Sequence, residues 1–246
     1  MFVTNAIRQW WTGSNHAKLI RSQNALLKRL VPHQFTSDQT VLNSVRFESP
    51  DGAVTDSDAQ DFVLAHGFGA GLGFYYQNVE ALLRSKHVKS VTLVDWLGMG
   101  GSARPACRAA PRLTCCDSDF TPTQAVHFFV DSFEKWRQVQ GLRNFALVGH
   151  SLGGYLSARY ALKYPKAVRK LVLASPVGFP TQPDDRLTRR DMPRGLAVID
   201  ALWSSNVTPQ QLVRMMGSRF GRRNVRRVLG ARISHLAEED AQLLVC

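Results

Sequence analysis

The sequence predicts an α/β fold in which helices pack on a mostly parallel, doubly wound sheet. Two observations support this prediction. Short apolar runs alternate with longer segments of helical periodicity between residues 41 and 175, and three glycine-rich turns each follow one of these runs. Such sheets bind ligands at the carboxyl ends of their strands. We therefore expect the functional site to lie where the three turns meet.

The individual elements follow from hydrophobic periodicity and from turn residues. The apolar runs predict strands at 41–47, 61–65, 90–95, 145–148 and 170–175, and the helical segments are 74–86, 120–140 and 155–164. A turn-rich stretch at 49–52 predicts a hairpin-like connection between the first two strands. Helix 120–140 starts at a Thr121-Pro122 cap. It also carries an aromatic stripe that we expect in the core: Phe128, Phe129, Phe133 and Trp136.

The junction between strand 145–148 and helix 155–164 is very short and contains a G-x-S-x-G pattern. The five residues are Gly149, His150, Ser151, Leu152 and Gly153. This pattern in this context predicts a nucleophile elbow, a strained turn that lifts a serine hydroxyl off the end of a sheet. Side chains at the two flanking glycines would collide where strand and helix nearly touch. Ser151 is therefore the candidate nucleophile.

The turn at 66–73, His-Gly-Phe-Gly-Ala-Gly-Leu-Gly, follows strand 61–65 and has two interpretations. Its Gly69-x-Gly71 could belong to a dinucleotide-binding loop, but Phe74 stands where the third glycine of G-x-G-x-x-G is needed. The alternative is the H-G-x-G loop that supplies an oxyanion-hole amide to serine hydrolases. Because Ser151 lies downstream, the second interpretation is favoured, and no cofactor is expected.

The motifs together resemble one subfamily of the alpha/beta hydrolases, the one containing abhydrolase-domain proteins four and five with their fungal and plant relatives. The likeness covers about residues 10–180. The matching segments are 66–73, 95–102 (Asp-Trp-Leu-Gly-Met-Gly-Gly-Ser), 129–137, 149–155, Pro176-x-Gly178-Phe179-Pro180 and the Trp10-Trp11 region. The resemblance implies an alpha/beta-hydrolase fold and lipid chemistry: deacylation of phospholipids, lysophospholipids, N-acyl-phosphatidylethanolamine or cardiolipin, or acyl transfer to lysophosphatidic acid. One member is a lipase co-activator at lipid droplets with asparagine at the position of Ser151, so serine here argues for the catalytic branch.

The roles implied for the site are those of a serine esterase. Ser151 attacks an ester carbonyl, while the backbone N–H of Leu152 and one from Phe68 or Gly69 hold the oxyanion. The serine needs a histidine oriented by a carboxylate, in the chain order Ser, Asp or Glu, His. His235 is the only histidine beyond the elbow, and its surroundings predict a solvated helix. Asp184 and Asp185 are more simply explained as a loop or helix start.

No further buried strand follows 170–175, so the sheet is expected to be truncated after the sixth strand of the family. Residues 181–246 predict an arginine-rich helical cap, with helices at 194–203 and 209–216 among them. The predicted organisation is a basic amphipathic segment at 1–35, a partial hydrolase core at 36–180 and an incomplete cap at 181–246. The acid-bearing strand and the histidine segment of the family have no counterpart, so the triad is incomplete.

The net charge of +12 comes from the two ends of the chain. Residues 1–33 carry five basic residues and no acid, and residues 182–235 carry eleven arginines against four aspartates. The helical face around residues 19–31 could lie on an anionic membrane, serve as an organelle transit sequence, or pack on the domain. We expect peripheral contact with an anionic membrane or lipid-droplet surface. No apolar run is long enough for a membrane span.

The cysteines Cys107, Cys115, Cys116 and Cys246 show neither C-x-x-C spacing nor a paired framework. This usage predicts a reduced, intracellular compartment and no metal site. The expected location is membrane-peripheral, mitochondrial or lipid-droplet associated.

Three hypotheses result. The first is a serine lipid hydrolase of which this is a partial chain. The second is a non-catalytic, lipid-binding or lipase-regulating protein of the same fold, whose sheet would have an open edge where a seventh strand should follow. The third is a nucleic-acid binder using the arginines at 222–227. It is disfavoured because aromatic stacking platforms are missing beside that cluster, and no nucleic-acid partner is expected.

Overall fold

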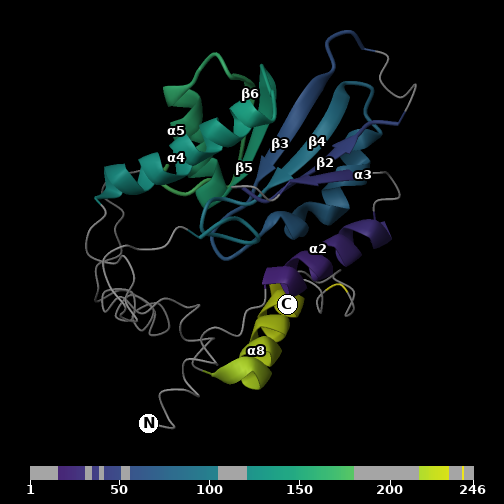
Figure 1. Ribbon diagram of the computed structural model, residues 1–246, viewed down its shortest axis with the longest axis vertical. Coiled ribbons are helices and arrows are strands. Elements are labelled where there is room, and N and C mark those ends of the chain that lie inside the picture. The colour runs from purple at the N-terminus through teal and green to yellow at the C-terminus, as the bar shows by residue number, and fades with distance from the viewer. Residues whose placement is uncertain are drawn as a thin grey trace. The chain divides into compact units, whose positions relative to one another are not determined.

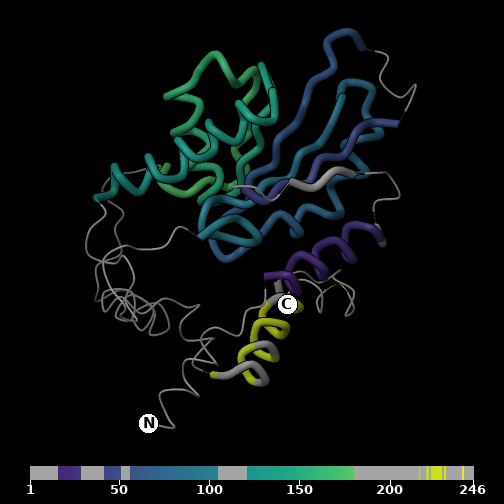
Figure 2. Tube along the Cα trace, in the orientation of Figure 1, coloured from purple at the N-terminus to yellow at the C-terminus, as the bar shows by residue number. Residues whose placement is uncertain are grey.

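The computed structural model describes residues 16–30, 35–38, 42–50, 56–104, 121–179, 216–232 and 240. The chain divides into two compact units, Gln23–Gly178 and Met1–Ser22 with Phe179–Cys246. Figure 1 shows the ribbon and Figure 2 the Cα trace. The predicted division into three segments stays a prediction.

The first unit is built on a six-stranded sheet. Its strands are β1 (Phe35–Asp38), β2 (Ser44–Glu48), β3 (Gln60–Ala65), β4 (Val88–Val94), β5 (Phe145–His150) and β6 (Val168–Ala174). They lie in the order β1-β2-β4-β3-β5-β6. The four strands β4, β3, β5 and β6 are parallel, while β1 and β2 pair antiparallel at one end. The predicted α/β class with a mostly parallel sheet is confirmed.

One expectation about the start of the sheet was wrong, and one strand was missed. Strands β2 and β3 form no hairpin, because β4 lies between them and pairs with both. Strand β1 was not predicted at all. The turn residues at 49–52 mark the end of a strand but carry no information about its partner. Strand β3 instead takes parallel partners on both edges, which makes it a central strand.

Helices pack on this sheet within the same unit. After β3 come a 3₁₀ turn at Leu72–Tyr75 and α3 (Tyr76–Leu83), which lies against β4. Helix α4 (Pro122–Val139) packs on α5 (Leu152–Lys163), and α5 lies against β5 and β6 (Figure 1). The predicted start of α4 is confirmed by a capping box, in which Thr121 and Gln124 exchange side-chain to backbone hydrogen bonds.

Two further helices carry much of the positive charge. Helix α2 (His16–Leu30) buries Leu26 and Leu27, and its Gln23 accepts a hydrogen bond from Asn43. This supports the packed-helix alternative for the second half of α2. Helix α8 (Gly217–Arg232) belongs to the other unit. The predicted helix 194–203 lies outside the described residues, as does 209–216 apart from Met216.

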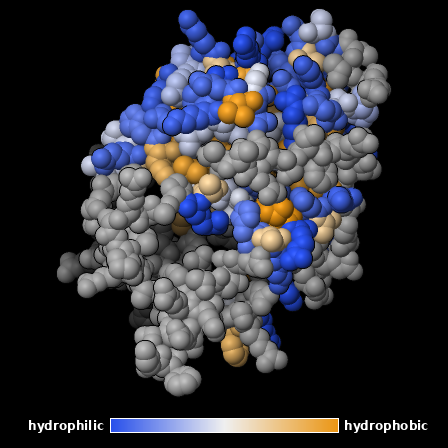
Figure 3. Space-filling view, in the orientation of Figure 1, coloured by the Kyte–Doolittle hydropathy of each residue, from blue (hydrophilic) through white to orange (hydrophobic). Residues whose placement is uncertain are grey.

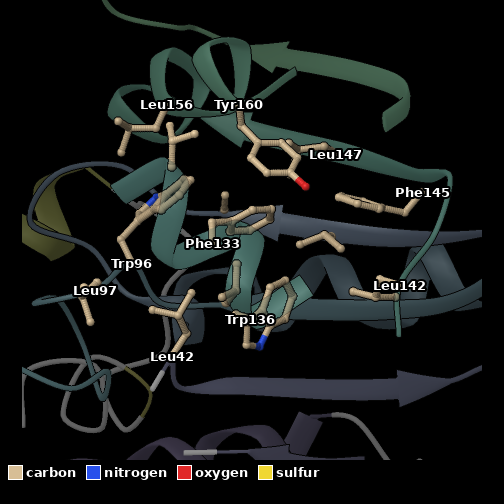
Figure 4. Close-up of a cluster of buried hydrophobic side chains, with 14 residues drawn as sticks. Leu42, Trp96, Leu97, Phe133, Trp136, Leu142, Phe145, Leu147, Leu156 and Tyr160 are labelled. Atoms are coloured by element: carbon tan, nitrogen blue, oxygen red, sulfur yellow. The ribbon is translucent and has the colours of Figure 1, made fainter. Parts of the chain in front are cut away.

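A cluster of buried hydrophobic side chains joins α4, α5, β5 and the turn after β4 (Figure 4). Phe133 is its centre, with ring centroids 4.8 Å from Tyr160 and 5.4 Å from Trp96. The predicted aromatic stripe is confirmed as core for Phe133 and Trp136, while its two other members are half-buried and pack against the cluster. Helices α4 and α5 are therefore joined through aromatic side chains.

Strand β6 is the edge of the sheet in the described part of the chain. It pairs only with β5, and its Leu171 and Val172 are 37% and 47% exposed. On the face shown in Figure 3, small hydrophobic areas lie among hydrophilic residues. Within the ranges given above, no helix combines the length and apolar character needed to cross a bilayer.

Candidate functional site

The three glycine-rich turns meet at the carboxyl ends of β3, β4 and β5, as predicted. Strand β3 is followed along the chain by β4 on one side, and β5 then pairs on its other side. The direction of winding therefore reverses at β3, and open α/β sheets bind ligands at such switch points. Ala65 and Gly149 lie side by side at these strand ends.

Ser151 occupies the single position between β5 and α5. Its φ is 54° and its ψ is −119°, a backbone conformation that is rare for residues other than glycine. The turn is held by the main chain: Ser151 N donates to Ala174 O at 3.0 Å, and Ser151 O accepts from Val177 N at 3.2 Å. The predicted tight junction is confirmed, and α5 begins at Leu152, three residues earlier than expected.

The glycines around Ser151 are required by close contact. A Cβ at Gly149 would lie 2.5 Å from Gly153 O, and a Cβ at Gly153 would lie 2.4 Å from both Ala65 O and His66 O. The start of α5 therefore presses directly on the end of β3. No other residue type fits these two positions without moving backbone.

The turn at 66–73 lies against Ser151. A Cβ on Gly67 would be 2.9 Å from the Cβ of Ser151, so the two backbones are nearly in contact. Phe68 and Gly69, the next two residues of this turn, are exposed. Leu152 is the first residue of α5, so its N–H has no acceptor within the helix. The structure thus brings together the residues that the sequence assigned to the nucleophile and the oxyanion hole.

His66 forms local hydrogen bonds. Its Nδ1 lies 2.8 Å from Gly67 O, and because a carbonyl only accepts, Nδ1 carries a proton there. Its Nε2 lies 3.3 Å from Asp95 Oδ1 and 3.4 Å from the Trp96 N–H, which donates to it. His150, by contrast, is exposed.

Tyr75 supports the same strand end. Its hydroxyl donates to Ala65 O at 2.9 Å, and burial raises the pKa of the phenol to about 12. The hydroxyl therefore stays a neutral donor through the physiological pH range.

Sequence reasoning did not assign a role to Asp95, which the structure places beneath the 66–73 turn with its carboxylate fully enclosed. In the sequence, Asp95 could have been recognised as a single acidic residue at the end of an apolar strand and within a glycine-rich turn.

No general base reaches Ser151 within the described ranges. Three histidines there face a carboxylate, in the pairs His66–Asp95, His87–Asp56 and His127–Asp131, and none of them hydrogen-bonds to Ser151. The candidates His235, Asp184 and Asp185 lie outside the described residues, as do all four cysteines. In that same part of the chain, no group of three or more His, Cys, Asp or Glu is placed to hold a metal ion.

Comparison with known proteins agrees with this geometry. The family model for the alpha/beta hydrolase fold matches residues 62–240. A 1-acylglycerol-3-phosphate O-acyltransferase of Arabidopsis thaliana is 38% identical over 218 residues, which are 85% of this chain and 47% of the relative. A human (lyso)-N-acylphosphatidylethanolamine lipase is 36% identical over 162 residues, 65% of this chain and 43% of the relative. The chain thus spans about half the length of these relatives.

Solved structures show the same fold. Cfl2 from Burkholderia cenocepacia superposes with a TM-score of 0.57 at 18% identity, covering 87% of this chain and 64% of that protein. The acyltransferase and lipase relatives belong to the subfamily that the motifs resemble, so the family expected from the sequence is confirmed. The chain belongs to the alpha/beta hydrolase fold family.

Proposed function

We propose that this chain carries the nucleophile of a serine hydrolase that acts on acyl esters of phospholipids, lysophospholipids or related lipids. The observation that carries the proposal is the conformation of Ser151. A serine with φ of 54°, placed between a parallel strand and a helix and pressed against Gly67, is strained in the way that exposes a nucleophile.

The reaction would begin when Ser151 Oγ attacks the ester carbonyl and loses its proton to a general base. The oxygen of the tetrahedral intermediate would accept hydrogen bonds from Leu152 N–H and from Phe68 or Gly69 N–H. Each such donor contributes about 3 kcal/mol to the transition state. Collapse of the intermediate would break the ester C–O bond, release the alcohol part of the lipid with the proton held by the base, and leave the acyl group on Ser151. Attack of water on this acyl-serine would give hydrolysis, and attack of the hydroxyl of a lysophospholipid would give acyl transfer.

The lipid class is supported by the relatives, whose names specify acylglycerol phosphate and N-acylphosphatidylethanolamine chemistry. Helix α8 supports contact with a negatively charged lipid surface. It contains six arginines and no acid, and it exposes Phe220 together with Arg223 and Arg227. Cations beside an exposed aromatic ring are typical of peripheral membrane contact.

A second function is favoured by one specific observation. The Ser151 hydroxyl has no hydrogen-bonded imidazole in the part of the chain that the structure describes. A chain with an idle nucleophile would be a non-catalytic lipid-binding or lipase-regulating protein of the same fold.

The deciding experiment is covalent labelling of the folded 246-residue chain with a serine-directed fluorophosphonate, followed by peptide mass spectrometry. Label confined to Ser151, lost in Ser151→Ala, supports the hydrolase. Ser157→Ala is the matched control, because this serine lies in α5, the helix that follows Ser151, and is fully buried. A folded chain that takes no label contradicts the catalytic proposal for this chain. If it then cosediments with vesicles containing phosphatidic acid but not with pure phosphatidylcholine vesicles, the second function is supported.

A further inference from the structure

Asp95 connects three segments that surround the site. It follows β4 directly and is 1% exposed. Its Oδ1 accepts a hydrogen bond from Leu72 N–H at 2.6 Å and lies 3.3 Å from His66 Nε2. Its Oδ2 accepts from Asn43 Nδ2 at 2.7 Å and from Gly101 N–H at 2.8 Å.

Asp95 and the residue that follows it, Trp96, therefore contact both ends of the 66–73 turn. His66 stands at the start of the turn and Leu72 near its end, and both face Oδ1. The residues between them include Gly67, which lies against Ser151, and the two candidate oxyanion donors. The Asp95 carboxylate thus holds the Leu72 end of the turn. The His66 end is held by the next residue, because Trp96 donates its backbone N–H to His66 Nε2 and its Nε1–H to His66 O.

We propose that Asp95 is a positioning residue that holds the 66–73 turn so that the N–H of Phe68 or Gly69 points at the substrate oxygen on Ser151. The inference rests on the proposed function, because it concerns the oxyanion hole of that reaction. It assigns to Asp95 no contact with substrate.

The chemistry of the surroundings requires a carboxylate at this position. Leu72 N–H, Asn43 Nδ2 and Gly101 N–H are all donors, so the group between them must only accept. An amide would turn its NH₂ toward donors on one side in either orientation. A larger group does not fit, because even a Cβ added to Gly100 would lie 2.2 Å from Asp95 Oδ2.

The same hydrogen bonds suggest a double variant in which the contact between positions 43 and 95 should form again. Asn43 donates to Asp95 and, at 2.8 Å, to Gln23 Oε1, while Gln23 Nε2 has no partner. In the double variant Asn43→Asp with Asp95→Asn, the new amide at 95 donates to the new carboxylate at 43 and accepts from Leu72 N–H. Rotation of the Gln23 amide then lets its Nε2 donate as well.

The test compares wild type, Asp95→Asn and the double variant by hydrogen–deuterium exchange of peptides covering 66–75 and by the rate of fluorophosphonate labelling at Ser151. We expect Asp95→Asn to raise exchange in the turn at least tenfold and to lower the labelling rate by about 10²-fold, the scale for loss of one oxyanion donor. With an ester substrate, kcat should fall while KM stays unchanged. The double variant should restore part of the protection from exchange and part of the labelling rate, because Gly101 N–H still faces the new amide.

Asp61→Asn is the matched control. Asp61 lies near the start of β3, the strand that leads into the 66–73 turn, and accepts hydrogen bonds from Arg46 and Ser90. These contacts are at the opposite end of the strand from the turn. If this control slows labelling as much as Asp95→Asn, the effect is general destabilisation and the proposal is wrong. The proposal also fails if Asp95→Asn leaves exchange unchanged, or speeds exchange without slowing labelling.

A second pair of variants decides the matter if Asp95→Asn does not fold. Leu72→Pro removes the N–H that donates to Asp95 together with the buried leucine side chain, at the first position of a 3₁₀ turn where proline is tolerated. Leu72→Ala keeps that N–H and loses the same side-chain packing. Slower labelling in the proline variant alone supports the proposal, and equal effects overturn it. If wild type itself takes no label, the proposed function fails, and exchange in the turn alone then decides whether Asp95 holds it.

Discussion

Replacing Glu134 by glutamine should weaken the attachment of α4 to α5, the helix that follows Ser151, and lower the free energy of unfolding. The carboxylate is 11% exposed and accepts four hydrogen bonds. Arg137 donates two of them at 2.8 Å, Gln138 one at 2.7 Å, and the hydroxyl of Tyr160 in α5 one at 2.6 Å. Glutamine keeps the shape but places an NH₂ group against these donors.

The magnitude follows from the pKa of Glu134, which hydrogen bonds from Arg137, Tyr160 and Gln138 lower from 4.5 to about 2. One pKa unit corresponds to about 1.4 kcal/mol, so the ionised carboxylate stabilises the folded state by about 3 kcal/mol. Because the pKa is lower in the folded than in the unfolded state, this contribution is complete above pH 4.5. It is lost as the pH falls through about 2.

The assay is urea unfolding followed by circular dichroism, for wild type and Glu134→Gln, from pH 7 down to pH 2. We expect a difference in unfolding free energy of about 3 kcal/mol at pH 7 that closes below pH 4.5. Glu80→Gln is the control, because the Glu80–Arg84 pair is exposed and should contribute less than about 1 kcal/mol. A Glu134→Gln difference at pH 7 as small as that of the control would refute the argument, and so would a difference that does not narrow in acid.

Two further predictions concern the elbow and the core. Gly153→Ala should lose about 2 kcal/mol or more of stability and most of the labelling at Ser151, since its Cβ meets the carbonyl oxygens of Ala65, the last residue of β3, and of His66. Gly230→Ala, in open space in α8, should be neutral or slightly stabilising in the same measurements; equal behaviour of the two variants would contradict the steric explanation. Phe133→Ala should lower the unfolding free energy by 3–5 kcal/mol, while Val139→Ala, 75% exposed in the same helix, should change it by less than about 0.5 kcal/mol. A small effect at Phe133 would show that the aromatic cluster is not the main link between α4 and α5.

Local features of the fold could be predicted because their causes are local. The short junction around Ser151 follows from two glycines and a serine placed between an apolar run and a helical pattern, and Ser151 has a φ of 54° there. The capped start of α4 at Thr121 and the burial of Phe133 follow from a capping residue and from helical spacing. Each of these signals lies within a few residues of the feature that it specifies.

Features that depend on pairing between distant segments could not be predicted. Turn residues at 49–52 suggested a hairpin, yet β4 takes the place beside β2, because strand pairing is decided by how all the apolar faces are buried together. The role of Asp95 also depends on distant partners, since Asn43 and Leu72 reach it from 52 and 23 residues away in the chain.

By itself, the sequence determined the fold class, the position of the elbow and the residues that could form an oxyanion hole, because local periodicity and glycine sterics specify them. The tertiary structure decided which turn lies against Ser151, which strands are neighbours and which carboxylate holds the site together. Those relations are contacts between segments far apart in the chain, and they arise only when the sheet brings the carboxyl ends of β3, β4 and β5 to one edge.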